Sequence, residues 1–397
     1  MENTVLNNGQ QAALKMAIER YNNKAPFTYI AGAAGTGKST LVAHIVAALG
    51  LNPKKDVCYA TYTGKAALNL QRKECPNACT MHSLLYDARQ NKYNGNYVFI
   101  PKAKGKIDYK LIIIDEISMV TQEMWDLALT HEIPIICLGD IAQLPAIGKV
   151  NDIVTRPHVV LNEIMRQEAD SEIVQVATLA REHKPIPFMK GSNVQVLHKN
   201  EFDASMLDWA DVVICATNKT RNNLNTTMRE RLWGDCDKTP RKGDKIVCLH
   251  NEWDFATKAG DTLVNGLVGY INNDPISVDY PYHLQKFCEN FYTFDFIPDF
   301  RDPGDSLAIF KDLRADSKIF TSGIPTVNEK NFRFFRNMQP MQFDYAYALT
   351  CHKCQGSEYG KVLVIEEGFP FEAEQKWKWL YTACTRAVDK LVIIRNS

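Results

Sequence analysis

The chain has 397 residues, a length at which two to three domains are expected. Its composition, 45% hydrophobic and 23% charged, is ordinary for a globular protein. The charges of its 46 basic and 46 acidic residues cancel. A protein that coats duplex DNA without sequence preference is usually basic, so any nucleic-acid-binding surface of this chain must be confined to a local region. No run of 18 apolar residues predicts a membrane span, and the first residues lack a basic-then-apolar signal. We expect a cytoplasmic protein whose eleven cysteines are free thiols.

An amphipathic helix is the first predicted element, capped by Asn7 or Asn8, and a buried strand follows over residues 27–31. Gln10 lies at the start of this helix, shortly before the strand. Its amide offers one donor and one acceptor and could therefore read the edge of an adenine, although an ordinary surface glutamine is the alternative.

The segment Gly32–Thr40 matches the phosphate-binding pattern G-x-x-x-x-G-K-[ST] and lies between that strand and a helical pattern. Its glycines let backbone N–H groups close on phosphate oxygens, and a helix N-terminus favours negative charge. Lys38 would reach the β- and γ-phosphates, and Ser39 would ligate Mg²⁺. A tight glycine turn without a nucleotide is the alternative. The predicted nucleotide contacts of the loop are Gly32, Ala33, Ala34, Gly35, Thr36, Gly37, Lys38, Ser39 and Thr40.

Polar residues follow the next strand, which is predicted over residues 57–61. Thr63 and Lys65 come directly after it, where the strands of an open α/β sheet face their ligand, and a backbone phosphate would suit them. An ordinary strand-to-helix loop is the alternative. Thr80 and His82 precede a further helix, and a capping role is the alternative for Thr80.

A polar segment over residues 86–108 contains Asn94-Gly95 between aromatic residues, which is the strongest local signal for a β-hairpin. The hairpin is predicted over residues 90–100, with Tyr93 and Tyr97 beside its turn. We interpret it as a small excursion from the sheet.

Two buried strands then lead to polar residues. The first ends at Asp115-Glu116, and this end of a parallel sheet faces the nucleotide, so Asp115 would hold Mg²⁺ through water and Glu116 would polarise the attacking water. The second, over residues 133–138, leads to Gln143, which is placed to contact a γ-phosphate. Arg166 follows and could stabilise charge on the transferred phosphoryl group, or form a surface ion pair.

The composition changes after Glu168. A strand over residues 211–215 and a helix over 222–232 are followed by residues 240–345, where short strands and tight turns are typical of a small β-barrel. No element is assigned to residues 290–323.

The α/β pattern resumes near residue 345, with a strand over 361–365, a helix over 377–385 and a last strand over 390–394. Arg386, which precedes the last strand, is a second candidate arginine finger. Four cysteines near histidines could form a joint zinc site, but their spacings fit no standard ligand pattern. They are Cys75, Cys79, Cys351 and Cys354.

In this order the motifs resemble those of superfamily 1 helicases, above all the branch of the Dda and RecD helicases, and the match extends from Gln10 to Arg386. Tyr62 replaces the usual proline of one RecD-like segment, and the hairpin region is short, so the strand-separating element is expected to be modest. The matching segments are Gly9-Gln10 (Q motif), Gly32–Thr40 (motif I), Ala60–Ala67 and Thr80–Leu85 (RecD-like segments), Asp115-Glu116 (motif II), Gly139–Pro145 (motif III), Arg166-Gln167 (motif IV), Thr350–Glu358 (motif V) and Tyr381–Ala387 (motif VI).

The resemblance implies an α/β fold with two RecA-like P-loop NTPase domains, a small hairpin insertion that acts as a pin, and an SH3-like β-barrel insertion. The expected boundaries are 1–85 and 107–167 for the first RecA-like domain (1A), 86–106 for the hairpin (1B), 168–239 and 346–397 for the second RecA-like domain (2A), and 240–345 for the accessory domain (2B).

The resemblance also implies that ATP and Mg²⁺ bind between the RecA-like domains and that single-stranded DNA crosses both. The expected catalytic residues are Lys38, Glu116, Gln143, Arg166 and Arg386. These residues, the P-loop, Gln10, Asp115, Gly356 and Glu358 would contact the nucleotide, and Ser39 and Asp115 would hold the metal. The expected DNA contacts are Thr63, Lys65, Thr80, His82, Tyr93, Tyr97, Thr350, His352 and Lys353.

The implied activity is 5′-to-3′ translocation by a monomer that unwinds duplex forks in replication, recombination or repair, in the host cytoplasm if the protein is phage-encoded. Single-strand-binding or recombination proteins are candidate partners, and no membrane is involved. Three alternatives stay open: an ATPase subunit of a recombination or nuclease complex that does not unwind alone, a nucleotide-dependent remodelling protein with little turnover, and RNA as the substrate.

Overall fold

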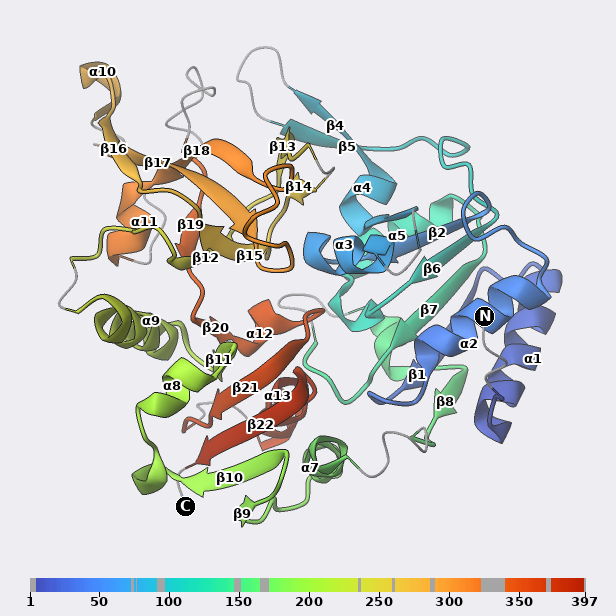
Figure 1. Cartoon of the computed structure of the whole chain (residues 1–397). Helices are drawn as coiled ribbons and strands as arrows, with labels where there is room; N and C mark the ends of the chain where they lie inside the picture. Colours follow the sequence, from blue (N-terminus) through green and yellow to red (C-terminus); the bar gives the residue numbers. More distant parts are fainter. Residues whose placement is uncertain are drawn as a thin grey trace.

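The computed structural model describes residues 5–395 apart from 73–74, 76, 91–96, 146–150, 165–170, 235–236, 259–260, 286–289, 323–339 and 369–372. Two largely parallel sheets and one antiparallel sheet form its framework, and Figure 1 shows them at the right, the lower centre and the upper left. We call these the first, second and accessory sheets. Within the described ranges, no helix is long and apolar enough to cross a membrane.

The described strands of the first sheet run parallel in the order β3-β2-β6-β7-β1-β8. Helices cover both faces, so the central strands are buried and apolar along their length. The strands are β1 (Phe27–Gly32), β2 (Val57–Thr61), β3 (Ala78–Thr80), β6 (Leu111–Ile114), β7 (Ile135–Gly139) and β8 (Val159–Leu161), and the helices are α1 (Asn8–Asn22), α2 (Lys38–Ala48), α3 (Gly64–Arg72), α4 (Met81–Leu85) and α5 (Gln122–Thr130).

The second sheet has the order β20-β11-β21-β22-β10-β9, in which the described strands are parallel except for β9. Its strands are β9 (Met189–Lys190), β10 (Val194–His198), β11 (Val212–Cys215), β20 (Ala348–Thr350), β21 (Tyr359–Ile365) and β22 (Ala387–Arg395). Its helices are α7 (Glu172–Arg181), α8 (Ser205–Trp209), α9 (Asn218–Trp233), α12 (Cys351–Cys354) and α13 (Ala373–Cys384).

The accessory sheet has the order β16-β17-β15-β12-β19, with β18 on the other side of β17. Backbone hydrogen bonds between Met341 and the end of β18 connect β18 to the chain that enters β19, so the described strands form a closed ring. Whether this ring is SH3-like stays a prediction. The elements are β12 (Lys245–Cys248), β13 (Glu252–Ala256), β14 (Thr262–Leu263), β15 (Val268–Ile271), β16 (Ile276–Asp279), α10 (Tyr282–Gln285), β17 (Asn290–Pro298), β18 (Phe310–Asp316), α11 (Ser317–Ser322) and β19 (Phe343–Tyr345).

Strands predicted over residues 27–31, 57–61, 133–138, 211–215 and 361–365 are present, with ends that differ by at most two residues. Other elements differ from the expectation. The hairpin pairs β4 (Tyr86–Gln90) with β5 (Tyr97–Pro101), so it begins four residues earlier than predicted, and its Asn-Gly turn lies outside the described residues. β17 and β18 occupy the stretch without a prediction, and β8 and β10 form without one.

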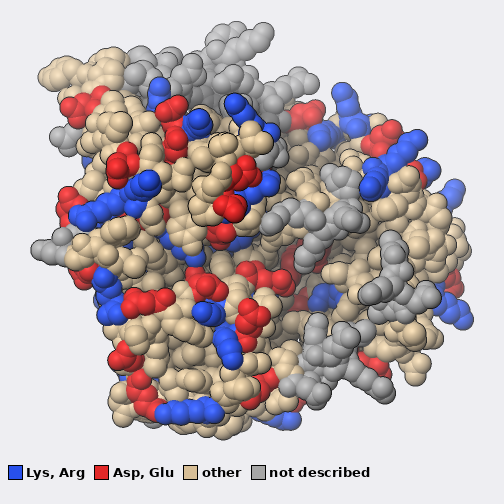
Figure 2. Space-filling model, viewed as in Figure 1, with Lys and Arg blue, Asp and Glu red and all other residues tan. Residues whose placement is uncertain are grey.

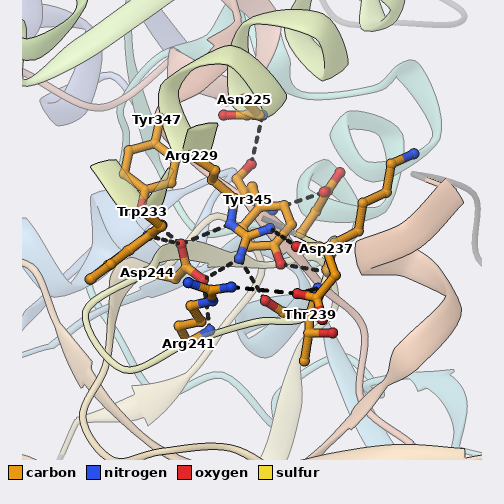
Figure 3. Close-up of polar contacts among 11 residues, drawn as sticks. Asn225, Arg229, Trp233, Asp237, Thr239, Arg241, Asp244, Tyr345 and Tyr347 are labelled. Carbon is orange, nitrogen blue, oxygen red and sulfur yellow. Dashed lines mark hydrogen bonds and ion pairs between the residues drawn. The ribbon is translucent and has the colours of Figure 1, made fainter. Parts of the chain in front are cut away.

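A buried network joins α9 to the two points where the chain enters and leaves the accessory sheet (Figure 3). Arg229 makes two hydrogen bonds to the carboxylate of Asp244, at 3.0 and 3.1 Å. Trp233 and Tyr347 donate to the same carboxylate at 3.2 and 2.8 Å. The guanidinium also lies 4.2 Å from the ring centroid of Tyr345. We call this set the Asp244 network.

The face of the molecule in Figure 2 carries basic and acidic residues side by side, without a continuous basic stripe in the part that is coloured. This agrees with the zero net charge of the chain.

Candidate functional site

The segment Gly32–Thr40 forms the turn between β1 and the N-terminus of α2, as a phosphate-binding loop requires. Gly35 and Gly37 have φ angles of 77° and 71°, in the left-handed region that favours glycine. The hydroxyl of Thr36 donates to the carbonyl of Ala33 at 2.8 Å. Residues of the loop itself therefore contribute to its shape.

The ammonium group of Lys38 lies over the first residues of this loop, where it donates to the carbonyl oxygens of Gly32 at 2.7 Å and Ala33 at 3.0 Å. A lysine at this position reaches the β- and γ-phosphates of a bound nucleotide. The place for the terminal phosphates therefore adjoins residues 32–34. Ser39 is exposed on the first turn of α2, and its hydroxyl oxygen is a ligand of the kind that Mg²⁺ prefers.

Gln10 is fully buried at the start of α1 and uses both ends of its amide inside the protein. Its Oε1 accepts the N–H of Asn7 at 3.0 Å in a capping box, and its Nε2 donates to the carbonyl of Thr36 at 3.1 Å. Gln10 thus supports the P-loop, and its contact with an adenine edge stays a prediction.

Asp115 and Glu116 follow β6, which lies between β2 and β7 in the first sheet. The Asp115 carboxylate accepts the N–H of Glu116 at 3.0 Å, and Glu116 adopts a φ of 53°. A non-glycine residue in this left-handed region is strained, which is common at functional sites. Desolvation first and the neighbouring Asp115 charge second raise the pKa of Glu116, while the positive charges of Arg386 and Lys38 act in the opposite direction.

Tyr381, on α13, connects the second sheet's domain to two loops of the first sheet's domain. Its hydroxyl donates to the Asp140 carboxylate and accepts the N–H of Ala34 at 3.1 Å. Both Tyr381 and Asp140 are 2% exposed. The contact therefore lies inside the cleft between the two α/β domains.

Two further side chains of the second domain hold the loop after β7. Thr382 accepts the N–H of Leu144 at 2.9 Å, and Gln355 donates to the carbonyl of Leu144 at 2.7 Å. Gln143, the residue before Leu144, is buried, and its own N–H donates to the carbonyl of Asp140 at 3.2 Å. The predicted γ-phosphate contact thus lies on a loop that the second domain grips.

Arg386 is buried in the turn between α13 and β22. Its guanidinium donates to the carbonyls of Thr382 at 3.1 Å and Ser357 at 3.2 Å. Its positive charge opposes the rise in the pKa of Glu116 that burial causes. Arg166 lies outside the described residues.

Most of the predicted DNA contacts lie at the carboxyl ends of β2, β3 and β20 or in the helices α3, α4 and α12 that follow these strands. The hydroxyl of Thr80 accepts the N–H of Ser83 at 3.1 Å, so the capping role is present. His82 and His352 are half-buried, and desolvation lowers the pKa of each ring, so both are neutral at pH 7. Thr350 is buried at the start of α12, and Lys353 is exposed on it.

A group of rings surrounds His82 at the base of the hairpin. The ring centroids of Tyr62, Tyr86 and Phe99 lie 6.2, 6.1 and 6.2 Å from that of His82. Phe99 is 43% exposed. Tyr93 lies outside the described residues, and Tyr97 belongs to β5.

Lys65 differs from the other predicted DNA contacts because it is buried where three parts of the molecule meet. Its ammonium group lies 3.6 Å from the Asp299 carboxylate, at the end of β17, and 5.1 Å from the ring centroid of Tyr359, in β21. Gly356 is close by: a Cβ there would lie 3.4 Å from the hydroxyl of Thr63. Gly356 is thus packed against a predicted DNA contact, and Glu358 is exposed.

A cavity of about 420 Å³ lies beside the P-loop, between the two α/β domains. The first domain contributes the start of the P-loop and the loop after β7, and the second contributes Arg181, His183, Trp377 and Lys378. The rings of His183 and Trp377 stack with centroids 5.9 Å apart. Asp140 and Glu374 also line the cavity, and Glu374 pairs with Lys378 at 3.0 Å, so open space, aromatic rings and charges of both signs adjoin the phosphate-binding loop.

No three His, Cys, Asp or Glu side chains in the described part of the chain are arranged to hold a metal ion together. The sulfur of Cys79, in β3, lies 3.6 Å from the sulfur of Cys58, in the adjacent strand β2. A Mg²⁺ ion held by Ser39 and Asp115 would complete its ligand shell with phosphate oxygens and water.

Family models match both α/β domains. One described as an AAA domain matches residues 5–201, and one described as a UvrD-like helicase C-terminal domain matches residues 345–394. The ATP-dependent RecD2 DNA helicase of Deinococcus radiodurans is 26% identical over 387 residues, covering 91% of this chain and 46% of the relative. The ATP-dependent DNA helicase dda of Enterobacteria phage T4 is 27% identical over 269 residues, covering 61% of this chain and 60% of the relative.

The resemblance to superfamily 1 helicases of the Dda and RecD branch is confirmed. The chain spans between 38% and 60% of the length of the curated relatives it matches. Solved structures show the same fold. Pif1 helicase from Candida albicans has a TM-score of 0.54 at 19% identity, covering 99% of this chain and 95% of that chain. Pif1 helicase from Bacteroides in complex with ADP-AlF3 and ssDNA has a TM-score of 0.54 at 16% identity, covering 98% and 92%. The two α/β domains are RecA-like.

Residues that hold the two RecA-like domains together were not among the predicted site residues. They are Tyr381, Thr382, Gln355 and Asp140, and each lies within a helicase motif of this chain. The sequence did contain one signal for these residues: each is a polar side chain inside a motif to which no nucleotide or DNA contact was assigned. The partner of such a residue is on the other domain, so spacing along the chain does not predict it.

Proposed function

We propose that this chain is an ATP-dependent DNA helicase that moves 5′ to 3′ on single-stranded DNA and unwinds duplex DNA in replication, recombination or repair. The observation that supports this most is the cleft, which has the P-loop and the Asp115-Glu116 pair on one RecA-like domain and Arg386 on the other, and in which Tyr381 of the second domain binds the P-loop at Ala34. A nucleotide bound between two such domains can change their separation as its terminal phosphate is bound and released. The relatives named above are described as ATP-dependent DNA helicases.

On this proposal, residues Gly32–Thr40 hold ATP, with Lys38 on its β- and γ-phosphates. Ser39 and Asp115 hold Mg²⁺, which neutralises negative charge on the phosphates. Glu116 orients and deprotonates the attacking water. Its raised pKa favours this role, because a base whose pKa lies nearer the working pH accepts a proton more readily.

The remaining nucleotide contacts come from the loop after β7 and from the second RecA-like domain. Gln143 contacts the γ-phosphate. Arg386 and Arg166 stabilise the charge that develops on the transferred phosphoryl group, as arginine fingers do. Gly356 and Glu358 of motif V complete the nucleotide contacts.

We assign domains 1A, 1B, 2A and 2B to the residues predicted from the sequence. Single-stranded DNA crosses 1A and 2A, the hairpin β4-β5 acts as the pin, and the ring of accessory strands is the SH3-like 2B domain. The exposed ring of Phe99 offers a base a surface for stacking beside the strand path. The proposed DNA contacts are Thr63, Lys65, Thr80, His82, Tyr93, Tyr97, Thr350, His352 and Lys353, and Lys65 must leave Asp299 to reach a phosphate.

A second candidate function is an ATPase subunit that translocates without unwinding alone. The observation that favours it is the hairpin, whose two described strands have five residues each, so the pin is small. A monomer acting in the cytoplasm with single-strand-binding or recombination proteins remains part of the first proposal.

Steady-state ATP hydrolysis with and without single-stranded DNA, with matched RNA as a control, tests the proposal. We expect strong stimulation by DNA alone, followed by unwinding of 5′-tailed but not 3′-tailed duplexes. Replacing residues 93–97 by a short Gly-Ser turn is expected to preserve DNA-stimulated hydrolysis and to lower unwinding. Stimulation without any unwinding favours the translocase subunit, and no stimulation contradicts both.

A further inference from the structure

The hydroxyl of Tyr381 joins the two RecA-like domains at the first residues of the P-loop. It donates to the Asp140 carboxylate and accepts the N–H of Ala34. Burial, followed by the nearby Asp140 charge, raises the pKa of this phenol, so the group keeps the proton that it donates. We propose that Tyr381 is a positioning residue that reports the arrival of the terminal phosphate of ATP at the P-loop to the second RecA-like domain. This inference rests on the proposed ATP-binding function.

The position of Ala34 in the loop supports this role. The ammonium group of Lys38 lies on the carbonyls of the two preceding residues, Gly32 and Ala33, so the terminal phosphates arrive next to Ala34. The backbone N–H groups of a P-loop are donors to phosphate oxygens. In this structure the N–H of Ala34 is used by Tyr381 instead. A terminal phosphate and the Tyr381 hydroxyl therefore compete for one donor.

Asp140 connects the same hydroxyl to the loop after β7. One carboxylate oxygen accepts the N–H of Ala142 at 3.0 Å, and the other accepts the Tyr381 hydroxyl. The backbone of this loop continues to Gln143, the predicted γ-phosphate contact. When a phosphate takes the N–H of Ala34, the Tyr381 hydroxyl keeps its bond to Asp140. Tyr381 then loses its contact with the P-loop and preserves its contact with the loop that carries Gln143.

The effect reaches Arg386 through a short stretch of chain. Tyr381 and Thr382 lie on the last turn of α13, and the Arg386 guanidinium donates to the carbonyl of Thr382. A shift of Tyr381 therefore moves an acceptor that holds the candidate arginine finger. The number of residues involved is small, and each contact is a single hydrogen bond that can be exchanged.

Calorimetric binding of AMP-PNP and of ADP in the presence of Mg²⁺ and the absence of DNA tests the competition. Only AMP-PNP carries a γ-phosphate group. Tyr381→Phe removes the hydroxyl but leaves the Asp140 carboxylate without this donor, and its negative charge would repel the phosphate. The comparison is therefore made in an Asp140→Asn background, which has no charge at this position. In that background we expect Tyr381→Phe to tighten AMP-PNP binding by roughly three- to tenfold, the value of one neutral hydrogen bond, and to leave ADP binding unchanged.

A matched variant separates this role from a structural one. Tyr292→Phe removes the hydroxyl of a buried tyrosine in β17, remote from the cleft, and changes neither affinity. In the otherwise native chain, Tyr381→Phe is expected to lower kcat for ATP hydrolysis.

An unchanged ratio, or an equal change for AMP-PNP and ADP, overturns the role of Tyr381. Absence of DNA-stimulated hydrolysis in the native chain overturns the proposed function instead. Since the binding comparison uses neither DNA nor turnover, the two failures are distinguishable.

Discussion

The second RecA-like domain makes two junctions that are built from opposite kinds of contact. Its junction with the accessory sheet is the Asp244 network, in which a buried carboxylate receives two hydrogen bonds from Arg229 and others from Trp233 and Tyr347. Its junction with the first RecA-like domain consists of separate hydrogen bonds. The hydroxyl of Tyr381 accepts from Ala34, and Thr382 and Gln355 bind the backbone of Leu144.

The difference indicates which junction moves. A buried ion pair with all of its partners in place is costly to separate, because either charge alone would be left without solvent. In the cleft, the bonds of Tyr381 with Ala34 and of Thr382 and Gln355 with Leu144 join neutral groups, and such a bond can be exchanged for one with a ligand at little net cost. The bond from Tyr381 to the Asp140 carboxylate is the charged exception. We therefore expect the accessory sheet to move with the second RecA-like domain as one body, while the cleft opens and closes. This movement requires the Lys65–Asp299 ion pair, which joins the first domain to the accessory sheet and whose carboxylate is 18% exposed, to separate.

Arg386→Ala tests the cleft and has the largest expected effect. Loss of an arginine finger should lower the rate of ATP hydrolysis by about 10³-fold or more. Single-stranded DNA binding and the melting temperature serve as checks on the fold. Arg231→Ala, on the exposed surface of α9, is the matched control and should hydrolyse ATP at the native rate. A rate for Arg386→Ala within tenfold of native would make this arginine structural.

Asp244→Ala tests the other junction and should act on stability rather than on chemistry. It leaves the guanidinium of Arg229 buried without its carboxylate, and breaking such a pair costs about 3–5 kcal/mol of unfolding free energy. Denaturant unfolding measures the loss. We expect ATP affinity to change little, because the hydrogen bonds of the network join α9 to the start of β12 and to Tyr347, away from the P-loop.

If Asp244→Ala lost as much free energy of nucleotide binding as free energy of unfolding, the two junctions would not be independent, and the comparison between them would fail. A second reading comes from cross-linking across the cleft, where ATP should change the distance between the RecA-like domains. The distance between α9 and β12 should stay constant.

The pH dependence of hydrolysis tests the electrostatics of the cleft. Desolvation and Asp115 raise the pKa of Glu116 above its usual value of 4.5. Glu116 must be ionised to accept a proton, so turnover should fall as the pH decreases through the raised pKa, and this acidic limb should lie above pH 4.5. Single-stranded DNA affinity over the same pH range is the control. A limb at or below pH 4.5 would show that Glu116 titrates as an exposed glutamate.

The sequence predicted the parts of the fold whose signal is local. The P-loop, the apolar strands of both RecA-like domains and the hairpin all follow from short stretches of residues. β17 and β18 form part of a sheet in which aromatic residues such as Phe294 and Phe296 pack against Phe343, about 50 residues away. That partner cannot be found by local periodicity, and the stretch therefore had no predicted element.

The candidate site divides in the same way. The residues of the P-loop are placed by their own backbone, and the loop has the geometry that its sequence predicts. Lys65 shows the limit, because its position after a strand predicts a phosphate contact while Asp299 of the accessory sheet, far along the chain, holds its ammonium group. Contacts between domains are set by the tertiary structure, so they cannot be predicted from the residues of a motif alone.

The smallest expected effect comes from an exposed ion pair between α8 and α9, the helix that carries Arg229 of the Asp244 network. Arg231 and Asp208 form an ion pair whose side chains are 33% and 43% exposed, so water solvates each charge when the other is removed. Asp208→Ala should therefore lower the unfolding free energy by about 1 kcal/mol or less, in contrast to Asp244→Ala. Denaturant unfolding of both variants in low and in 1 M salt compares them directly: the small difference at Asp208 should vanish in high salt, where exposed charges are screened, and the large one at Asp244 should persist. Equal losses at the two positions would mean that burial does not separate them, and the expectation that the accessory junction is the rigid one would lose its physical basis.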